Sequence, residues 1–167
     1  HELKSILQSN IDLAEVRFAL HDVVHSCPVL TDEEPNFLVK ARRNLIVSAI
    51  NNLIDNSIYW LDHRWGNQAK KKYVYVGVSE EFDKGPAIVV ADNGPGWRDI
   101  NKDEMVKPFR TTKAAGMGIG LYFADTVMQM HGSELLLLEP GDIDGVPEPA
   151  DGAIAALVFN GGTPCKK

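Results

Sequence analysis

Apolar residues return at helical spacing along two stretches in the first part of the chain. The first stretch runs from residue 2 to residue 24 and predicts one amphipathic helix. The second runs from residue 36 to residue 65 without Pro or Gly, which predicts a long and largely buried helix. The apolar positions are Leu3, Ile6, Leu7, Leu13, Val16, Leu20, Val23 and Val24 in the first, and Leu38, Ala41, Leu45, Ile46, Ala49, Ile50, Leu53, Ile54, Ile58 and Leu61 in the second.

β-Branched and aromatic residues then dominate two short segments, 73–78 and 87–91, which the turn-prone residues 83–86 separate. This pattern predicts two adjacent antiparallel strands. Residues 119–131 follow as a helix that Gly132 can end in a left-handed cap. Two more strands are expected at 134–138 and 153–159. The connection between them, 139–152, is rich in proline, glycine and acidic residues, so we expect a loose surface loop.

Length, composition and charge limit the class of protein. A chain of 167 residues with 44% hydrophobic residues fits one globular domain. A net charge of -6 argues against a broad nucleic-acid surface, because phosphate neutralisation needs clustered Lys and Arg. The one basic run, Lys70-Lys71-Lys72, is expected to be a solvated turn at the entrance to a strand. Cys27 and Cys165 show no metal or redox spacing, which is typical of free thiols in a reducing compartment.

The chain carries no targeting signal that the sequence makes visible. Its longest apolar run, residues 153–159, is far shorter than the ~20 residues that span a bilayer. It also begins with His1 and not Met, so we expect a piece of a longer protein. We expect this piece to be cytoplasmic, and the sequence leaves open whether the parent protein associates with a membrane.

The long helix carries amides that share one stripe. Asn52, Asn56 and Tyr59 lie within about 60° of one another on a helical wheel, away from the apolar side. A buried amide costs free energy unless it finds partners, and satisfaction of nearby backbone groups is the simpler interpretation. An Asn oxygen can also bind Mg²⁺ beside water and phosphate.

Two glycine-rich loops follow the strand at 87–91. Asp92 opens the first loop, where its carboxylate can either form a turn or accept a hydrogen bond from an exocyclic amine such as that of adenine. In the second loop, Gly118 and Gly120 precede a helix, and the free N–H groups of a helix start can bind an anion. Between the loops, residues 111–113 offer two hydroxyls and one ammonium, although a solvated loop is the simpler interpretation. The order of all four features favours a nucleotide site.

This order resembles the ATP-binding domain shared by gyrase, the heat-shock chaperone, histidine kinases and the mismatch-repair protein MutL, the GHKL or Bergerat fold. Residues 52–57 look like its N box, 92–96 its first glycine box, 107–113 its F box and 116–121 its second glycine box. The resemblance covers residues 37–159. It implies an α+β fold, a two-layer α/β sandwich in which helices cover one face of a mixed, mostly antiparallel sheet, with an extra N-terminal helix.

The resemblance also implies a role for each residue of the motifs. Asn56 is expected to hold Mg²⁺, Asp92 to bond the adenine amine, and Phe109 to anchor the lid over the phosphates. The expected ATP-binding residues are Asn52, Asn56, Asp92, Gly94, Gly96, Phe109, Thr111, Thr112, Lys113, Gly116, Gly118, Ile119, Gly120 and Leu121. The cofactors are therefore ATP and Mg²⁺.

One position favours the histidine-kinase branch of the family. Hydrolysing members carry a Glu four residues before the Mg²⁺ Asn, and this chain has Asn52 there, which cannot take a proton. We therefore expect transfer of the γ-phosphoryl group to a histidine acceptor, with Asn52 and Lys113 in support and no catalytic residue assigned. The chain departs from the branch at Tyr59, where a basic residue is common, and at 153–156, where many relatives have a Thr.

The kinase resemblance implies partners and a domain division. Residues 1–30 are expected to be an N-terminal helix left from a dimerisation or phosphoacceptor region, and 31–167 the catalytic domain. His1-Glu2 looks like a phosphoacceptor motif, but a single short helix cannot form the usual two-helix unit. We expect the acceptor histidine in the same or a partner chain, a response regulator, and a homodimer formed by regions outside this sequence. The alternatives are a nucleotide-gated ATPase module with Asp55 as its base, or a domain whose site has decayed.

Overall fold

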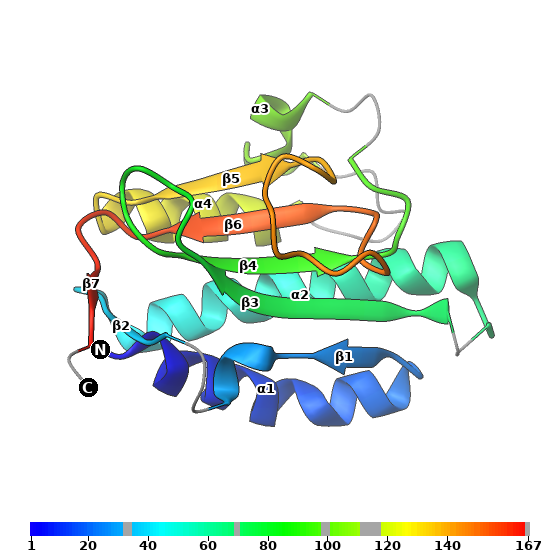
Figure 1. Ribbon diagram of the computed structural model, residues 1–167. Coiled ribbons are helices and arrows are strands. Elements are labelled where there is room, and N and C mark those ends of the chain that lie inside the picture. The colour runs from blue at the N-terminus through cyan, green and yellow to red at the C-terminus, as the bar shows by residue number, and fades with distance from the viewer. Residues whose placement is uncertain (32–34, 69–70, 98–100, 111–117, 166–167) are drawn as a thin grey trace.

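The computed structural model describes residues 1–31, 35–68, 71–97, 101–110 and 118–165. Figure 1 shows helices below and behind a twisted sheet. The elements are, in chain order, α1 (Leu3–Leu20), β1 (Val24–Ser26), the 3-10 helix η1 (Pro28–Leu30), β2 (Phe37–Leu38), α2 (Arg43–Trp65), β3 (Tyr73–Ser79), β4 (Ala87–Asp92), α3 (Lys102–Met105), α4 (Gly120–Met130), β5 (Glu134–Leu138), β6 (Ile154–Val158) and β7 (Thr163–Pro164).

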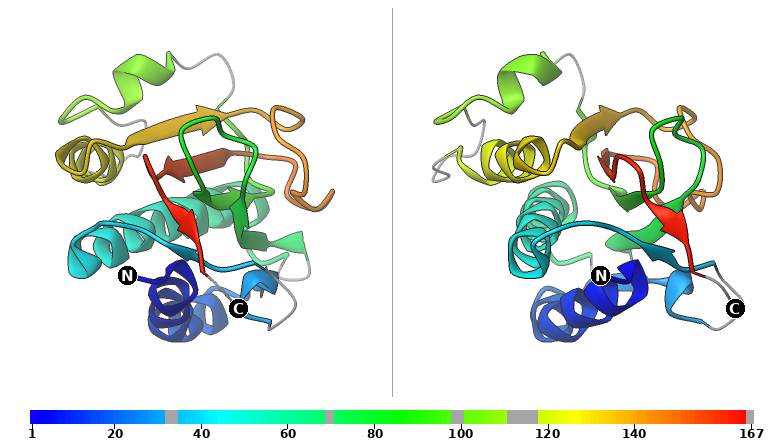
Figure 2. Two further views of the ribbon diagram at one scale, coloured as in Figure 1. Left: turned by 60° about the vertical axis from the view of Figure 1, so that its left-hand side comes forward. Right: turned by 90° about the vertical axis from the view of Figure 1, so that its left-hand side faces the viewer.

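The main sheet has the strand order β1-β3-β4-β6-β5. Only its β1–β3 pair is parallel; the other neighbours are antiparallel. Side chains alternate across the sheet, so that Val76 and Val90 face the core with α1, α2 and α4, whereas Val89 and Ala156 face the other side. The two layers are seen edge-on in Figure 2. The predicted fold class, α+β with a mostly antiparallel sheet covered on one face by helices, is confirmed.

The connection between β5 and β6, residues 139–152, is not the loose loop that its composition predicts. It folds over the face of the sheet that carries no helices (Figure 2). Ile143 and Ala150 are buried there against Val89 and Ala156, and the Asp144 N–H donates to the Glu81 carboxylate at 3.0 Å. The loop joins two antiparallel strands and is mostly exposed, as predicted, but it is not loose, because a few apolar residues among the prolines and glycines cover an apolar sheet face.

The apolar positions of α1 divide between two faces of the helix. Leu3, Ile6 and Leu7 are buried and form part of the same core as α2 and the sheet. Three residues with the same helical spacing point outward: Leu13, Val16 and Leu20 are 59%, 67% and 74% exposed. Helical spacing alone assigns both sets of apolar residues to one face of α1, whereas α2 and the sheet cover only the face that carries Leu3, Ile6 and Leu7. The division of the chain at residue 30 stays a prediction, although α1 shares one core with the rest.

The long helix starts seven residues later than its periodicity predicts. Phe37 and Leu38 form β2, which pairs with β7, and α2 begins at Arg43. No side chain of α2 caps this start; instead the Arg42 N–H donates to His131 Nε2 at 2.8 Å, while His131 Nδ1 meets the Val127 carbonyl at 2.6 Å. His131 therefore links the end of α4 to the start of α2. The predicted cap after α4 is confirmed, because Gly132 has φ 63°.

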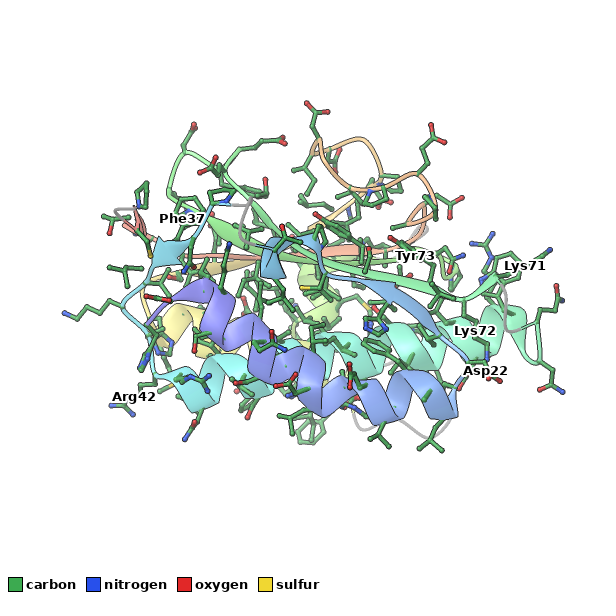
Figure 3. The ribbon with its side chains drawn as sticks, turned by 60° about the horizontal axis from the view of Figure 1, so that its bottom comes forward. Asp22, Phe37, Arg42, Lys71, Lys72 and Tyr73 are labelled. Atoms are coloured by element: carbon green, nitrogen blue, oxygen red, sulfur yellow. The ribbon has the colours of Figure 1, made fainter. Side chains whose placement is uncertain are left out.

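The basic run at 70–72 is only partly a solvated turn. Lys71 is exposed, but the ammonium of Lys72 is buried and donates to Asp62 Oδ1 at 2.6 Å and to the His21 carbonyl at 3.0 Å. Figure 3 shows Lys72 beside the turn at Asp22, with Arg42 at the opposite end of the molecule. Burial acts to raise the pKa of Asp62, but hydrogen bonds from Lys72 and His21 outweigh it and hold the pKa below its ordinary value.

The described helices include none that is long and apolar enough to cross a membrane.

Candidate nucleotide site

The site lies between α2 and the end of β4. α2 turns three polar residues of its middle part toward this region: Asn52, Asn56 and Ser57. The Asn52 amide donates back to the Ser48 carbonyl at 2.9 Å. Asn56 is half-buried, and within the described part of the chain its amide makes no hydrogen bond. Ser57 is buried on the side of α2 that faces the sheet.

Asp92, the last residue of β4, is 2% exposed, and its carboxylate accepts three hydrogen bonds from the protein. Ser57 Oγ donates to Oδ2 at 2.7 Å, and the N–H groups of Gly94 and Ala153 donate to Oδ1 at 2.8 and 3.3 Å. Burial raises the pKa of Asp92, which those three hydrogen bonds and the charge of Arg64 offset only in part. The carboxylate is thus a fixed, desolvated acceptor at the end of a core strand.

The first glycine loop is held from two sides. On one side, Arg64 near the end of α2 donates to the carbonyls of Asn93 and Gly94 at 2.8 and 2.7 Å, and its guanidinium lies 4.4 Å from the Trp65 ring centroid. On the other side, Gly152 packs so closely that a Cβ there would come within 2.6 Å of the Gly94 carbonyl oxygen. The backbone of this loop is therefore fixed by residues outside its own motif.

A small cavity lies beside Asp92. Its volume is about 10 Å³, roughly the room that one water needs. The Trp97 indole fills this region, is 4% exposed, and donates from Nε1 to the Ile154 carbonyl at 3.1 Å. The residues that line the cavity are Leu53, Asn56, Ser57, Val90, Asp92, Trp97, Ala153 and Ala155. The acceptor and the apolar walls suit an aromatic base, but a base enters only if the lining moves.

The second glycine box meets the N box across the helices. α4 begins at Gly120 so close to α2 that a Cβ there would lie 3.3 Å from Asn52 Oδ1. Gly118 has φ 67° and stands against the backbone of Arg110. Ile119 is partly exposed and Leu121 is buried. The structure thus places the start of a helix, with its free N–H groups, next to the amide stripe.

The F box is exposed where it is described. Phe109 is 77% exposed and has φ 61°, so the apolar contact expected of it is not formed in this structure. Lys107 and Arg110 pair with Glu104, a few residues before them. Four of the predicted site residues lie outside the described residues: Thr111, Thr112, Lys113 and Gly116.

The structure therefore brings Asn52, Asn56, Asp92, Gly94 and Gly120 together around one region, with Gly96 in the same loop at φ 75°. The motifs did not point to Ser57, Arg64, Trp97 or Gly152. A signal for Ser57 was available, because it falls three residues after Ile54 and four before Leu61, on the buried side of the helix. A polar residue in such a row needs a partner.

Two other features of the described residues bear on the site. A larger cavity of about 470 Å³ lies on the opposite face of the sheet, beside Tyr75, Glu81 and Ile143, and no predicted site residue lines it. In the described part of the chain, no three His, Cys, Asp or Glu side chains gather as metal ligands.

Comparison with known proteins assigns the family. The model of the family described as "Histidine kinase-, DNA gyrase B-, and HSP90-like ATPase" matches residues 41–159. The chain belongs to this family, as its motifs predict. The matched region begins at the entrance to α2 and ends after β6, so it contains every part of the site described above.

Curated relatives and solved structures come from sensor kinases. A probable C4-dicarboxylate sensor kinase of Halalkalibacterium halodurans is 38% identical over 85 residues, which is 50% of this chain and 15% of that protein. The C4-dicarboxylate transport sensor protein DctS of Rhodobacter capsulatus is 31% identical over 99 residues, 58% of this chain and 14% of that protein. The matched segments therefore cover less than a fifth of either relative.

The solved structures agree with the fold. A mycobacterial sensor histidine kinase, MprB, matches with a TM-score of 0.71 at 19% identity, over 99% of this chain and 97% of that one. The catalytic domain of the histidine kinase ThkA matches with a TM-score of 0.70 at 18% identity, over 96% of this chain and 94% of that one. Both matches include the region of α1, and at this identity they establish the fold alone.

Proposed function

We propose that this chain binds Mg-ATP and transfers its γ-phosphoryl group to a histidine, as the catalytic domain of a sensor histidine kinase. The observation that carries the proposal is Asp92, a desolvated carboxylate fixed by three donors at the end of β4, opposite the amides of α2. An ionised carboxylate only accepts hydrogen bonds, so it suits the amine of adenine.

The proposed roles follow the positions of the side chains. Asp92 binds the base, and the loop at Gly94 and Gly96 passes along it. Asn56 offers an amide oxygen to Mg²⁺, whose other ligands would be water and phosphate. The helix start at Gly118–Leu121 offers N–H groups to the phosphates, and Phe109, Thr111, Thr112, Lys113 and Gly116 are proposed to complete that side.

Bound Mg-ATP supplies the reactive phosphoryl group, and the protein supplies position and charge neutralisation. Asn52, one turn before Asn56, donates to a backbone carbonyl and cannot remove a proton from water. Its position therefore supports transfer to a separate acceptor over hydrolysis. The alternative of a nucleotide-gated ATPase is less well supported, because its proposed base, Asp55, is exposed and pairs with Arg17 on the α1 side.

Two histidines that follow α1, His21 and His25, contact other parts of the fold, which supports an acceptor outside this sequence. His21 Nδ1 meets Asp62 Oδ2 at 2.5 Å, and the His25 ring stacks on Phe18 at 4.5 Å between centroids. We propose that this domain is cytoplasmic and phosphorylates a histidine of the same or a partner chain. We further propose that a response regulator is a partner and that the protein dimerises through regions outside this sequence.

Two experiments test this function. Isothermal titration calorimetry of Mg-ATP should show binding to the wild type and none to Asp92→Ala; a folded wild type that fails to bind overturns the proposal. The parent protein incubated with γ-labelled ATP should then gain an acid-labile, base-stable phosphate. Phosphate release without such a product would assign the chain to the ATPase alternative.

A further inference from the structure

Ser57 stands out among the buried residues of α2. Its neighbours on the same face, Ile50, Ile54 and Leu61, are fully buried aliphatic residues. Ser57 is 4% exposed and its hydroxyl donates to Asp92 Oδ2 at 2.7 Å. A hydroxyl in an apolar row costs free energy unless it is bonded, so this contact is the physical reason for a serine here.

The two oxygens of Asp92 are held in different ways. Oδ1 accepts from two backbone N–H groups, those of Gly94 and Ala153, which no side-chain change removes. Oδ2 accepts from Ser57, the one side-chain donor to Asp92 among the described residues. Ser57 therefore fixes the rotation of the carboxylate. A change of the side chain at position 57 removes the bond to Oδ2 and leaves the two bonds to Oδ1 in place.

The charge state of Asp92 decides which base its carboxylate can bind. An ionised carboxylate accepts from an amine and repels a carbonyl oxygen, whereas a protonated one can donate to a carbonyl. Burial favours protonation, and the bond from Ser57 is the largest of the effects that oppose it. The charged group that acts on Asp92 from α2 is Arg64, and the cavity residues of β4, β6 and the first loop are uncharged apart from Asp92 itself.

We propose that Ser57 is a positioning residue that sets base specificity: its hydroxyl holds Asp92 as an oriented, ionised acceptor, so that the site takes a purine with a 6-amino group in preference to a 6-oxo group. This inference rests on the proposed nucleotide binding and deepens it. Ser57 acts through Asp92 and is not itself assigned a contact with the nucleotide.

The test compares ATP with inosine triphosphate, which differs at the purine 6-position in carrying a carbonyl where ATP has an amine. Both Mg-nucleotides are titrated by calorimetry into the wild type, Ser57→Ala and Ser57→Thr. The wild type should prefer ATP. Ser57→Ala should lose about tenfold of that preference, as expected for one hydrogen bond to a charged group. Ser57→Thr keeps the hydroxyl and should retain the preference.

Ser48→Ala is the matched control, because it removes an exposed hydroxyl from the same helix and should change neither affinity. If Ser57→Ala does not fold, Ser57→Cys replaces it, since a thiol keeps the volume but is a weak donor. An equal loss for both nucleotides, or an unchanged preference, would overturn the specificity role while leaving the nucleotide site intact. A folded wild type that binds neither nucleotide would instead reject the proposed function.

Discussion

The two ends of the candidate site are built in different ways. At the base end, Asp92 is bonded by Ser57 and Ala153, residues 35 and 61 positions away in the chain. At the phosphate end, the described residues of the F box are exposed and pair with Glu104, three to six positions away. The proposed base end is therefore part of the core, whereas the described residues of the F box make local, solvent-exposed contacts that are worth little in water.

The largest effect should be on the free energy of unfolding, where Trp97 at the base end contrasts with Phe109 in the F box. Trp97 is buried beside Asp92, so Trp97→Ala should lower the free energy of unfolding by about 3–5 kcal/mol, the usual cost of truncating a buried aromatic residue. Thermal or urea unfolding followed by circular dichroism measures this change. A loss below about 1 kcal/mol would mean that the base end is not part of the core.

The next effect concerns affinity. Asp92→Asn replaces one acceptor oxygen by an amide NH2 group and should weaken Mg-ATP binding about a hundredfold, since a donor would then face the adenine amine. Calorimetry measures the change, and Asp103→Asn on the exposed turn α3 is a control that should leave it unaltered. Equal losses in both variants would point to net charge and not to the buried acceptor.

Arg64 tests whether the loop must be held from α2. Arg64→Ala removes two hydrogen bonds to the first glycine loop, each worth about 1.5–3 kcal/mol to the fold. It should weaken Mg-ATP about tenfold, because part of that free energy must then be supplied when the nucleotide orders the loop. Arg64→Lys keeps the charge near Asp92 but not the paired bonds, so it should recover only part of the loss. Full recovery would assign the effect to charge alone.

The two ends should also respond differently to pH. Burial raises the pKa of Asp92, and the ionised form binds the amine, so affinity for ATP should be complete above that raised pKa and fall as pH drops through it. The ratio of ATP to inosine triphosphate affinity is the measurement, because it cancels the titration of the phosphates. It should fall as the pH is lowered, and it should do so at a higher pH than that at which an ordinary carboxyl group titrates.

Glu104 provides the matched control at the phosphate end. A hydrogen bond from Lys107 lowers the pKa of Glu104, so this carboxylate should lose its charge only at a lower pH than Asp92 does. Glu104→Gln should therefore leave the pH profile unchanged. A flat profile in the wild type would contradict a role for the ionised Asp92 carboxylate in selecting the base.

The smallest effect is expected for Phe109. Phe109→Ala should change the free energy of unfolding by less than about 0.5 kcal/mol, because the ring is exposed and makes no core contact. The unfolding experiment used for Trp97→Ala gives the direct comparison. A large loss would show that the F box packs against the domain in solution.

The sequence predicted the parts of the site that a short motif encodes. Asp92, Gly94, Gly96 and the Asn52–Asn56 stripe were found because turn chemistry and helical spacing are local properties. Ser57, Arg64 and Gly152 were missed because their roles depend on which distant segment they meet. The family model supports the identity of the motifs, and the ligand roles of these residues stay predictions.

The same limit explains the errors in the fold. Helical periodicity assigned Leu13, Val16 and Leu20 to the core, but packing covers one face of α1 only. Residues 37–38 continue a helical pattern yet pair with β7, since tertiary pairing outweighs propensity over so short a segment. Lys72 was expected in solvent because the sequence does not show that its partner, Asp62, lies beside it at the end of α2.

The distant contacts of Asp92 make nucleotide binding a report on folding. The hydrogen bonds to the Asp92 carboxylate form only when α2, β4 and the start of β6 have all assembled. A partly folded chain therefore has no binding-competent base end. A nucleotide would therefore bind the native state alone, and by mass action it would raise the unfolding temperature of the whole domain. When no nucleotide is bound, unfolding of the domain would break the hydrogen bonds to Asp92 together with the packing of the core.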